Sequence, residues 1–181
     1  MKLEPIVTQP IIEAGRFDLR PVQMSDAGLI TLYGGDKRVA CNTTDIPHPL
    51  PPGAAEAFLE RAMDSEHPED VWAMDATRMG GAEVMGLVGL ERMDRDQSEI
   101  GYWVAPAYWN SGVASAAVEA ILKANPQKAR TVFASVFQDN AASARVLTNC
   151  GFQYLGDAES FSVARNAKVP TWTYSRACSD G

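Results

Sequence analysis

Basic residues are too few in this sequence to give the protein a positive surface. It has 16 lysines and arginines against 23 aspartates and glutamates, and its formal net charge at pH 7 is -7. Binding to a nucleic-acid backbone depends on basic side chains that displace counterions from the phosphates. We therefore expect no nucleic-acid partner, whereas a cationic partner would suit the acidic surface.

Long apolar runs are also missing. No stretch approaches the roughly 20 consecutive apolar residues that span a bilayer. The N-terminal residues MKLEPIVTQP lack the basic flank and the apolar core of a signal peptide. We therefore predict no association with a membrane and a cytoplasmic location.

Cysteine is rare, with Cys41, Cys150 and Cys178 as the three examples. Their odd number and wide spacing fit neither a disulfide framework nor a CxxC metal site, so we expect free thiols and no metal. The 181 residues are 46% hydrophobic, enough to bury a core without cross-links. We predict one domain over residues 1–181, with residues 1–15 as a loose N-terminal arm.

The first half of the chain predicts short strands separated by turns and two helices. Ser25 is the expected N-cap of the first helix, and four prolines make residues 42–53 an irregular loop. An antiparallel meander should follow. The predicted elements are a strand over 17–22, helices over 25–34 and 54–63, and strands over 71–75, 83–92 and 99–104.

In the second half of the chain, the spacing of the apolar residues changes. Ala114, Val118, Ile121 and Leu122 recur with helical spacing until Asn125-Pro126 ends the helix. Residues 131–137 are apolar at nearly every position, which is typical of a strand buried on both faces. The remaining predictions are a helix that Asn140 opens and Gly151 closes, and strands over 152–155 and 172–175.

The segment EIGYWVAPAYWNSGVASAAVEAIL, residues 99–122, joins a strand to a helix through a tight loop of small residues. A helix start exposes unpaired N–H groups and about half a positive charge, so it can hold an anion. Gly112, Ala114 and Ser115 are small enough to let a diphosphate approach. Neither GxxxxGK[ST] nor GxGxxG is present, which argues against ATP and NAD. A tight turn at Gly112 without any ligand explains the spacing equally well.

The segment QDNAASARVLTNCGF, residues 138–152, sets Asn140 and Ser143 on the first turn of a helix that follows a buried strand. Their side chains could hydrogen-bond a ligand. The alternative is that Asn140 is only an N-cap and Ser143 only a small helix residue.

Taken in order, FDLRPV, EIGYWVAPAYWNSGVAS and NAASARVLTNCGF resemble the GNAT superfamily of N-acetyltransferases over nearly the whole chain. Within the superfamily, these segments most resemble the branch of ribosomal-protein alanine N-acetyltransferase-like proteins. This resemblance implies an α+β fold, the acyl-CoA N-acyltransferase fold, with a mixed, mostly antiparallel central sheet and helices on both faces. It also implies acetyl-CoA as the cofactor.

The resemblance further implies that the strand over 99–104 splays from its neighbour and pairs with the pantetheine arm. Asn140 and Ser143 would contact the pantetheine or the phosphate-bearing end. The groove would be lined by Tyr102, Trp103 and Val104, and the pyrophosphate would lie on the N–H groups of Asn110, Ser111, Gly112, Val113, Ala114 and Ser115.

Two positions depart from the superfamily pattern. Trp109 stands at the first position of [RQ]xxGx[GA], so the backbone must bind the anion. Leu147 replaces the tyrosine that often serves as general acid, which excludes a tyrosine acid at that position.

Acetyl transfer requires a neutral amine, and therefore a base. Glu99 is the candidate, directly or through water, although an ordinary solvated carboxylate is the alternative. Ser143 is the candidate catalytic acid for the departing thiolate, with Cys150 or solvent as alternatives. Backbone amides near Val104 would polarise the thioester carbonyl.

The expected acceptor site is built from the loop over 41–52 and the first two helices. His48 and Asp45 are candidate substrate-binding residues there; His48 could instead be structural, and Asp45 could be an ordinary solvated carboxylate. The resulting prediction is an N-acetyltransferase that acts on a primary amine, either a protein N-terminus or a small amine, as a monomer or homodimer. The alternative is a catalytically silent acyl-CoA-binding sensor or interaction module.

Overall fold

One eight-stranded sheet forms the centre of the computed structural model, which describes residues 9–178. The strand order is β1-β2-β3-β4-β5-β6-β8-β7, and of these pairs only β5 and β6 run parallel. This confirms the predicted mixed, mostly antiparallel sheet. The strands are β1 (Ile12–Glu13), β2 (Asp18–Pro21), β3 (Glu69–Asp75), β4 (Gly86–Met93), β5 (Gln97–Val104), β6 (Thr131–Phe137), β7 (Gln153–Ser162) and β8 (Ala167–Ala177).

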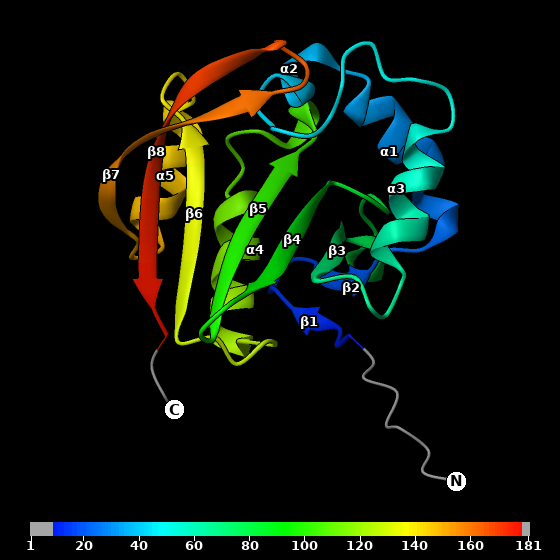
Figure 1. Cartoon of the computed structure of the whole chain (residues 1–181). Coiled ribbons are helices and arrows are strands. Elements are labelled where there is room, and N and C mark those ends of the chain that lie inside the picture. The colour runs from blue at the N-terminus through cyan, green and yellow to red at the C-terminus, as the bar shows by residue number, and fades with distance from the viewer. Residues whose placement is uncertain (1–8, 179–181) are drawn as a thin grey trace, which may run out of the picture.

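Helices pack on both faces of the sheet, as predicted. Helices α4 and α5 cover one face, and α1 and α3 cover the other (Figure 1). None of the helices within residues 9–178 is long and apolar enough to cross a bilayer. The helices are α1 (Ala27–Gly34), α2 (Lys37–Ala40), α3 (Ala54–Ala62), α4 (Val113–Ala124) and α5 (Ala141–Asn149), with short 3-10 turns at Met24–Asp26, Thr77–Met79 and Pro106–Tyr108.

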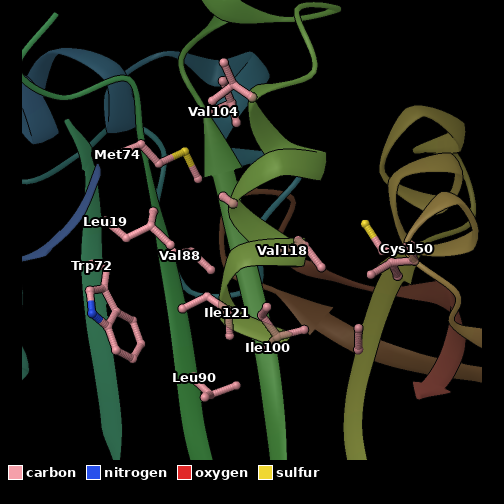
Figure 2. Packing of buried hydrophobic residues seen from close by; sticks show 14 of the residues in the cluster. Leu19, Trp72, Met74, Val88, Leu90, Ile100, Val104, Val118, Ile121 and Cys150 are labelled. Atoms are coloured by element: carbon pink, nitrogen blue, oxygen red, sulfur yellow. The ribbon is translucent and has the colours of Figure 1, made fainter. Parts of the chain in front are cut away.

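The larger core lies between the sheet and α4. Val118 and Ile121 are fully buried against Ile100 and its neighbours on β3 and β4, as Figure 2 shows. The other two residues of the predicted stripe, Ala114 and Leu122, are half-buried at its margin. Each buried branched aliphatic side chain contributes roughly 1.5–3 kcal/mol, so this stripe fixes α4 on the sheet.

Helix α5 is bounded by the two caps that its sequence predicts. The Asn140 side-chain oxygen accepts a hydrogen bond from the Ser143 N–H at 3.3 Å. At the other end Gly151 has φ 84°, and the Phe152 N–H donates to the Leu147 carbonyl at 3.0 Å. This pattern is a Schellman ending, and it fixes where the chain turns into β7.

Strand β5 separates from β6 after three residue pairs. The register joins Gln97–Glu99 to Thr131–Phe133, and β5 has no partner on β6 beyond Glu99. The expected splay is therefore present. Beyond Glu99, β5 is therefore paired only with β4.

The β7–β8 hairpin is much longer than the two short strands that the sequence predicts. Its tip reaches across to the loop that follows α2, as Figure 1 shows. The Val163 N–H donates to the Thr44 carbonyl at 3.0 Å, and the Arg165 Nε donates to the Cys41 carbonyl at 2.9 Å. Arg165 also pairs with Asp139, so the hairpin is tied both to the loop and to the end of β6.

Three local predictions are wrong. Strand β6 is not buried on both faces, because Ser135 is exposed and Phe133 is half-buried. Ser25 is not the N-cap of α1, since a 3-10 turn precedes the helix and Asp26 takes that position. Residues 9–15 are not a loose arm, because β1 pairs with β2; residues 1–8 lie outside the described residues.

A buried ion pair holds the start of α1 to the sheet. Asp26 is 1% exposed and accepts hydrogen bonds from both terminal nitrogens of Arg20 at 2.9 and 2.8 Å. The Arg20 Nε also donates to Asp75 at 2.6 Å. The cluster links β2, β3 and the turn before α1.

We expect Asp26→Ala to destabilise the protein by about 3 kcal/mol, because it leaves the Arg20 charge buried with half of its partners. Urea unfolding followed by circular dichroism measures this loss. Glu159→Ala, which removes the exposed partner of Lys168, is the control and should cost far less. Equal losses in the two variants would contradict a special role for the buried pair.

Candidate active site

Two cavities meet where β5 leaves β6. The larger, of about 820 Å³, lies among α1, α3, the loop after α2 and the sheet. The smaller, of about 520 Å³, lies between the starts of α4 and α5. Their shared lining residues, which form the junction, are Asn42, Tyr102, Trp103, Asn140 and Ser143.

The smaller cavity is built around the turn before α4. Gly112 caps the helix with φ 80°, and Asn110 also has a positive φ, of 59°. Among residues 9–178, the N–H groups of Val113, Ala114 and Ser115 find no protein acceptor. All six residues predicted to bind the pyrophosphate line this cavity. A helix start of this kind can hold an anion.

Three arginines add positive charge near the start of α4, and none of them was predicted from the sequence. Arg38 and Arg145 line the smaller cavity. The Arg16 guanidinium donates to the Ser111 carbonyl at 2.8 Å. These residues come from three distant parts of the chain, so no local sequence pattern predicts that they lie together. Together they add cationic side chains where the expected motif arginine is replaced by Trp109.

Trp109 closes the end of β5. Its indole N–H donates to the Val104 carbonyl at 2.7 Å, and the Arg38 guanidinium lies 5.6 Å from the centre of its ring. The indole therefore satisfies a strand carbonyl and holds a cation beside the smaller cavity.

Tyr102 and Ser143 meet at the junction. The Tyr102 hydroxyl lies 2.9 Å from the Ser143 Oγ and 3.1 Å from the Ser143 carbonyl. Burial raises the pKa of Tyr102 to about 12. The phenol consequently stays protonated at neutral pH and can act as a hydrogen-bond donor. Asn140 lies beside this pair as the cap of the Ser143 N–H.

Glu99 lines the larger cavity, three residues before Tyr102 on β5. Alternation along the strand sets its side chain on the opposite face from that of Tyr102. Burial, and then repulsion from Glu91 and Asp45, raise the pKa of Glu99 above its ordinary value. This brings the carboxylate closer in basicity to a base that works near neutral pH.

Glu99 is the end of a row of three carboxylates across the sheet. Glu69 on β3 stands directly opposite Glu91 on β4, which stands opposite Glu99 on β5. Among residues 9–178, none of the three forms an ion pair with a basic side chain. Burial, and then Glu91, raise the pKa of Glu69. Like charges directly opposite each other destabilise a sheet, so this glutamate row is unfavourable for folding alone.

Near the glutamate row, two paired glycines leave part of the sheet surface without side chains. Gly89 pairs with Gly101 two register positions from the Glu91–Glu99 pair, on the same face of the sheet. A Cβ on Gly101 would meet no atom within 4 Å, whereas one on Gly89 would come within 2.9 Å of the Glu69 Oε2. The Glu69 carboxylate therefore lies over Gly89, and the space above Gly101 is open.

The remaining predicted residues divide between the site and its surroundings. Asp45 lines the larger cavity. His48 is exposed and lines neither cavity, contrary to prediction; His67 is the histidine in the larger cavity. Cys150, the alternative acid, is buried outside both cavities. Its Sγ lies 3.7 Å from the Ser115 carbonyl, and burial raises its pKa to about 11.

No group of three or more histidine, cysteine, aspartate or glutamate side chains within residues 9–178 is arranged to hold a metal ion.

Sequence comparison relates this chain to acetyltransferases. Residues 16–153 match the family described as acetyltransferase (GNAT) domain. The uncharacterised N-acetyltransferase YoaA of Bacillus subtilis strain 168 is 24% identical over 171 residues, which cover 92% of this chain and 96% of YoaA.

Solved structures share the fold. The microcin C7 self-immunity acetyltransferase MccE, in complex with acetyl-CoA and AMP, has a TM-score of 0.78 at 14% identity, with 90% of this chain and 93% of that chain covered. The ribosomal-protein-S5-alanine acetyltransferase of Vibrio fischeri has a TM-score of 0.75 at 21% identity, with 95% and 98% covered.

We expect Glu69→Gln to raise the melting temperature at pH 7 by about 1–2 °C, a value reduced for partial exposure. The raised pKa means that the folded state binds the proton more tightly than the unfolded state does. The destabilisation is therefore complete above the folded pKa and disappears as the pH falls towards the unfolded value of about 4.3. Thermal melts from pH 7 to 4 should show the gain shrinking. Glu60→Gln, on the exposed side of α3, should show no such trend, and a pH-independent gain at Glu69 would contradict the repulsion.

Proposed function

The chain belongs to the GNAT acetyltransferase family, and on that premise we propose that it transfers the acetyl group of acetyl-CoA to a primary amine as a single domain. The observation that carries this proposal is the junction of the two cavities. One cavity has an anion-binding helix start, the other has carboxylates, and they share the residues at the open side of β5.

The smaller cavity would hold acetyl-CoA. The free amides of Val113, Ala114 and Ser115, supported by Arg38 and Arg145, suit a pyrophosphate. The pantetheine arm would then run along the side of β5 that β6 leaves unpaired. This route leads to the junction, where the thioester would supply an activated acetyl group.

The larger cavity would hold the amine. An ammonium group has no lone pair for attack, so a base must remove one proton before or during the reaction. Glu99 lines this cavity and has a raised pKa. It would take the proton directly or through a water molecule.

Attack of the amine on the carbonyl carbon forms the amide bond and breaks the bond to sulfur. Backbone N–H groups near Val104 would stabilise the developing oxyanion. Ser143 would give a proton to the departing thiolate. Tyr102 is hydrogen-bonded to Ser143 and remains protonated, so it would hold that hydroxyl in place.

A second candidate function rests on Leu147, which is fully buried where related enzymes often have a tyrosine acid. It is a silent acyl-CoA-binding module. Release of coenzyme A in the presence of a panel of primary amines separates the two. Binding of acetyl-CoA without turnover of any amine would favour the silent module.

We expect Glu99→Gln to lower kcat by about 100-fold without changing the affinity for acetyl-CoA, because it removes the base and leaves the smaller cavity intact. The pH profile provides the sharper test. In the wild type, log kcat/KM should rise with slope 2 below the raised pKa of Glu99 and slope 1 above it, since base and amine must both lose a proton. The variant should keep slope 1 throughout. A wild-type slope of 1 over the whole acid range would remove Glu99 as the base.

We expect Gly112→Glu to weaken acetyl-CoA binding by about 100-fold or more, equivalent to about 2.7 kcal/mol. The new carboxylate would lie against the pyrophosphate. Gly80→Glu is the matched control, because Gly80 has a similar φ of 76° and open space around it, but lines neither cavity. Calorimetric titration should show normal affinity in the control. Normal affinity in the Gly112 variant would overturn the assignment.

A further inference from the structure

The floor of the larger cavity changes from acidic to apolar along β5. On the face towards α1 and α3, Glu99, Gly101 and Trp103 follow one another at every second residue. The Trp103 ring lies on that face, because its centre is 6.5 Å from the centre of the Tyr33 ring on α1. On β4 the register partners repeat the order of carboxylate, glycine and apolar side chain; they are Glu91, Gly89 and Leu87. The paired glycines therefore separate an acidic end of the floor from an apolar end.

Gly101 is not required by the packing of the protein itself. Its φ is not positive, and a Cβ at this position would meet no atom within 4 Å. Gly89 differs, because the Glu69 carboxylate lies over it. Glycine weakens the interior of a strand and often marks a place where a ligand approaches the backbone. The open space over Gly101 therefore indicates the position of a bound group.

Apolar side chains from the sheet, from α3 and from the loop after α2 surround the apolar end. Trp103 and Phe58 pack on the core between the sheet and the helices α1 and α3, but both are only half-buried and line the cavity. Leu50 and Ile46 also line it, and a Cβ on Gly34 of α1 would lie 3.8 Å from Leu50 and 4.0 Å from Ile46. Covering half-buried side chains of this kind with an apolar group is favourable.

The β7–β8 hairpin provides a further wall of the same cavity. Ser160 and Thr171 of the hairpin line the cavity, and the hydrogen bond from the Val163 N–H to the Thr44 carbonyl joins the hairpin to the loop after α2. The cavity volume of about 820 Å³ lies within the range of roughly 300–1,000 Å³ that is common for small-molecule sites. Such sites are mostly apolar and have a few polar groups that orient the ligand. These walls favour a compact molecule over an extended peptide.

We propose that the acceptor is a small primary amine with an aromatic or branched apolar group, bound with its nitrogen at Glu99 and its apolar group over Gly101. This inference rests on the proposed function and names the substrate class of the same site. Trp103 and Phe58 cover the apolar group. Glu99 and Trp103 are four residues apart on one strand, which is about 13 Å at 3.3 Å per residue. A short arylalkylamine fits between their two side chains.

The test compares 2-phenylethylamine with 2-(pyridin-4-yl)ethylamine, which have the same shape and differ in one polar ring atom. The wild type should acetylate the phenyl compound with a kcat/KM at least about tenfold higher, mainly through a lower KM. Phe58→Ala should reduce this preference to about threefold or less. Phe161→Ala removes a phenylalanine that is 52% exposed and lines neither cavity, so this control should retain the preference.

Gly101→Val tests the position of the apolar group. The new side chain would occupy the open space without a clash at its Cβ, so the variant should fold. We expect the KM for 2-phenylethylamine to rise at least about tenfold, while the affinity for acetyl-CoA stays unchanged. Gly156→Val in β7 is the matched control, because a Cβ on Gly156 also meets no atom within 4 Å and this residue lines neither cavity. An unchanged KM in the Gly101 variant would contradict the proposed position.

Equal kcat/KM for the two amines would overturn the apolar-amine proposal while coenzyme A release upheld the transferase. A higher kcat/KM for a peptide with an N-terminal phenylalanine than for 2-phenylethylamine would also overturn it. If no amine is acetylated, the proposed function fails, and calorimetric titration of the two amines into the coenzyme A complex still decides the inference. Binding of the phenyl compound that is at least about tenfold tighter, with the difference lost in Gly101→Val, supports it, and equal binding of the two amines refutes it.

Discussion

The separation of β5 from β6 is the constraint on which the rest of the site depends. A parallel pair that continued to Val104 would use up the backbone groups of β5 and close the junction between the cavities. Pairing stops at Glu99 and Phe133 instead. The side chains on the two faces of β5 beyond that point contact different helices, with Tyr102 against Ser143 of α5 and Trp103 against Tyr33 of α1. A single strand thereby provides the shared wall of the whole site.

Electrostatics gives the two cavities opposite character. The helix start at Gly112 and three arginines from separate segments make the smaller one positive. The glutamate row makes the larger one negative, although the fold gains nothing from aligning these carboxylates. Such an arrangement lowers the stability of the ligand-free protein, and functional sites commonly keep features of this kind. On the proposed function, the contrast would also keep the anionic cofactor and the cationic acceptor in separate cavities until they meet at the junction.

The sequence predicted the elements whose signals are local. The stripe on α4, the Asn140 cap, the Gly151 ending and the turn at Gly112 each follow from a few neighbouring residues. The family and its fold were predicted from the order of such segments, and both are confirmed. The glutamate row could not be predicted, because it depends on the register among three strands. Arg16 and Arg38 were missed for a similar reason, since tertiary folding alone brings them to the Gly112 turn. The prediction that β6 is buried on both faces is wrong because an apolar run does not reveal a cavity beside the strand.

The docking of the β7–β8 hairpin has a consequence for how the protein is made. Arg165 ties the hairpin to the loop after α2 by donating to the carbonyl of Cys41, which precedes it by 124 residues, and residues of both segments line the larger cavity. The turn at Gly112 is complete much earlier in synthesis. On a ribosome the larger cavity therefore takes shape only after the β7–β8 hairpin has emerged, and contacts of such long sequence separation form slowly. A nascent chain that stalls before the hairpin would have a complete turn at Gly112 but a larger cavity that still lacks one of its walls.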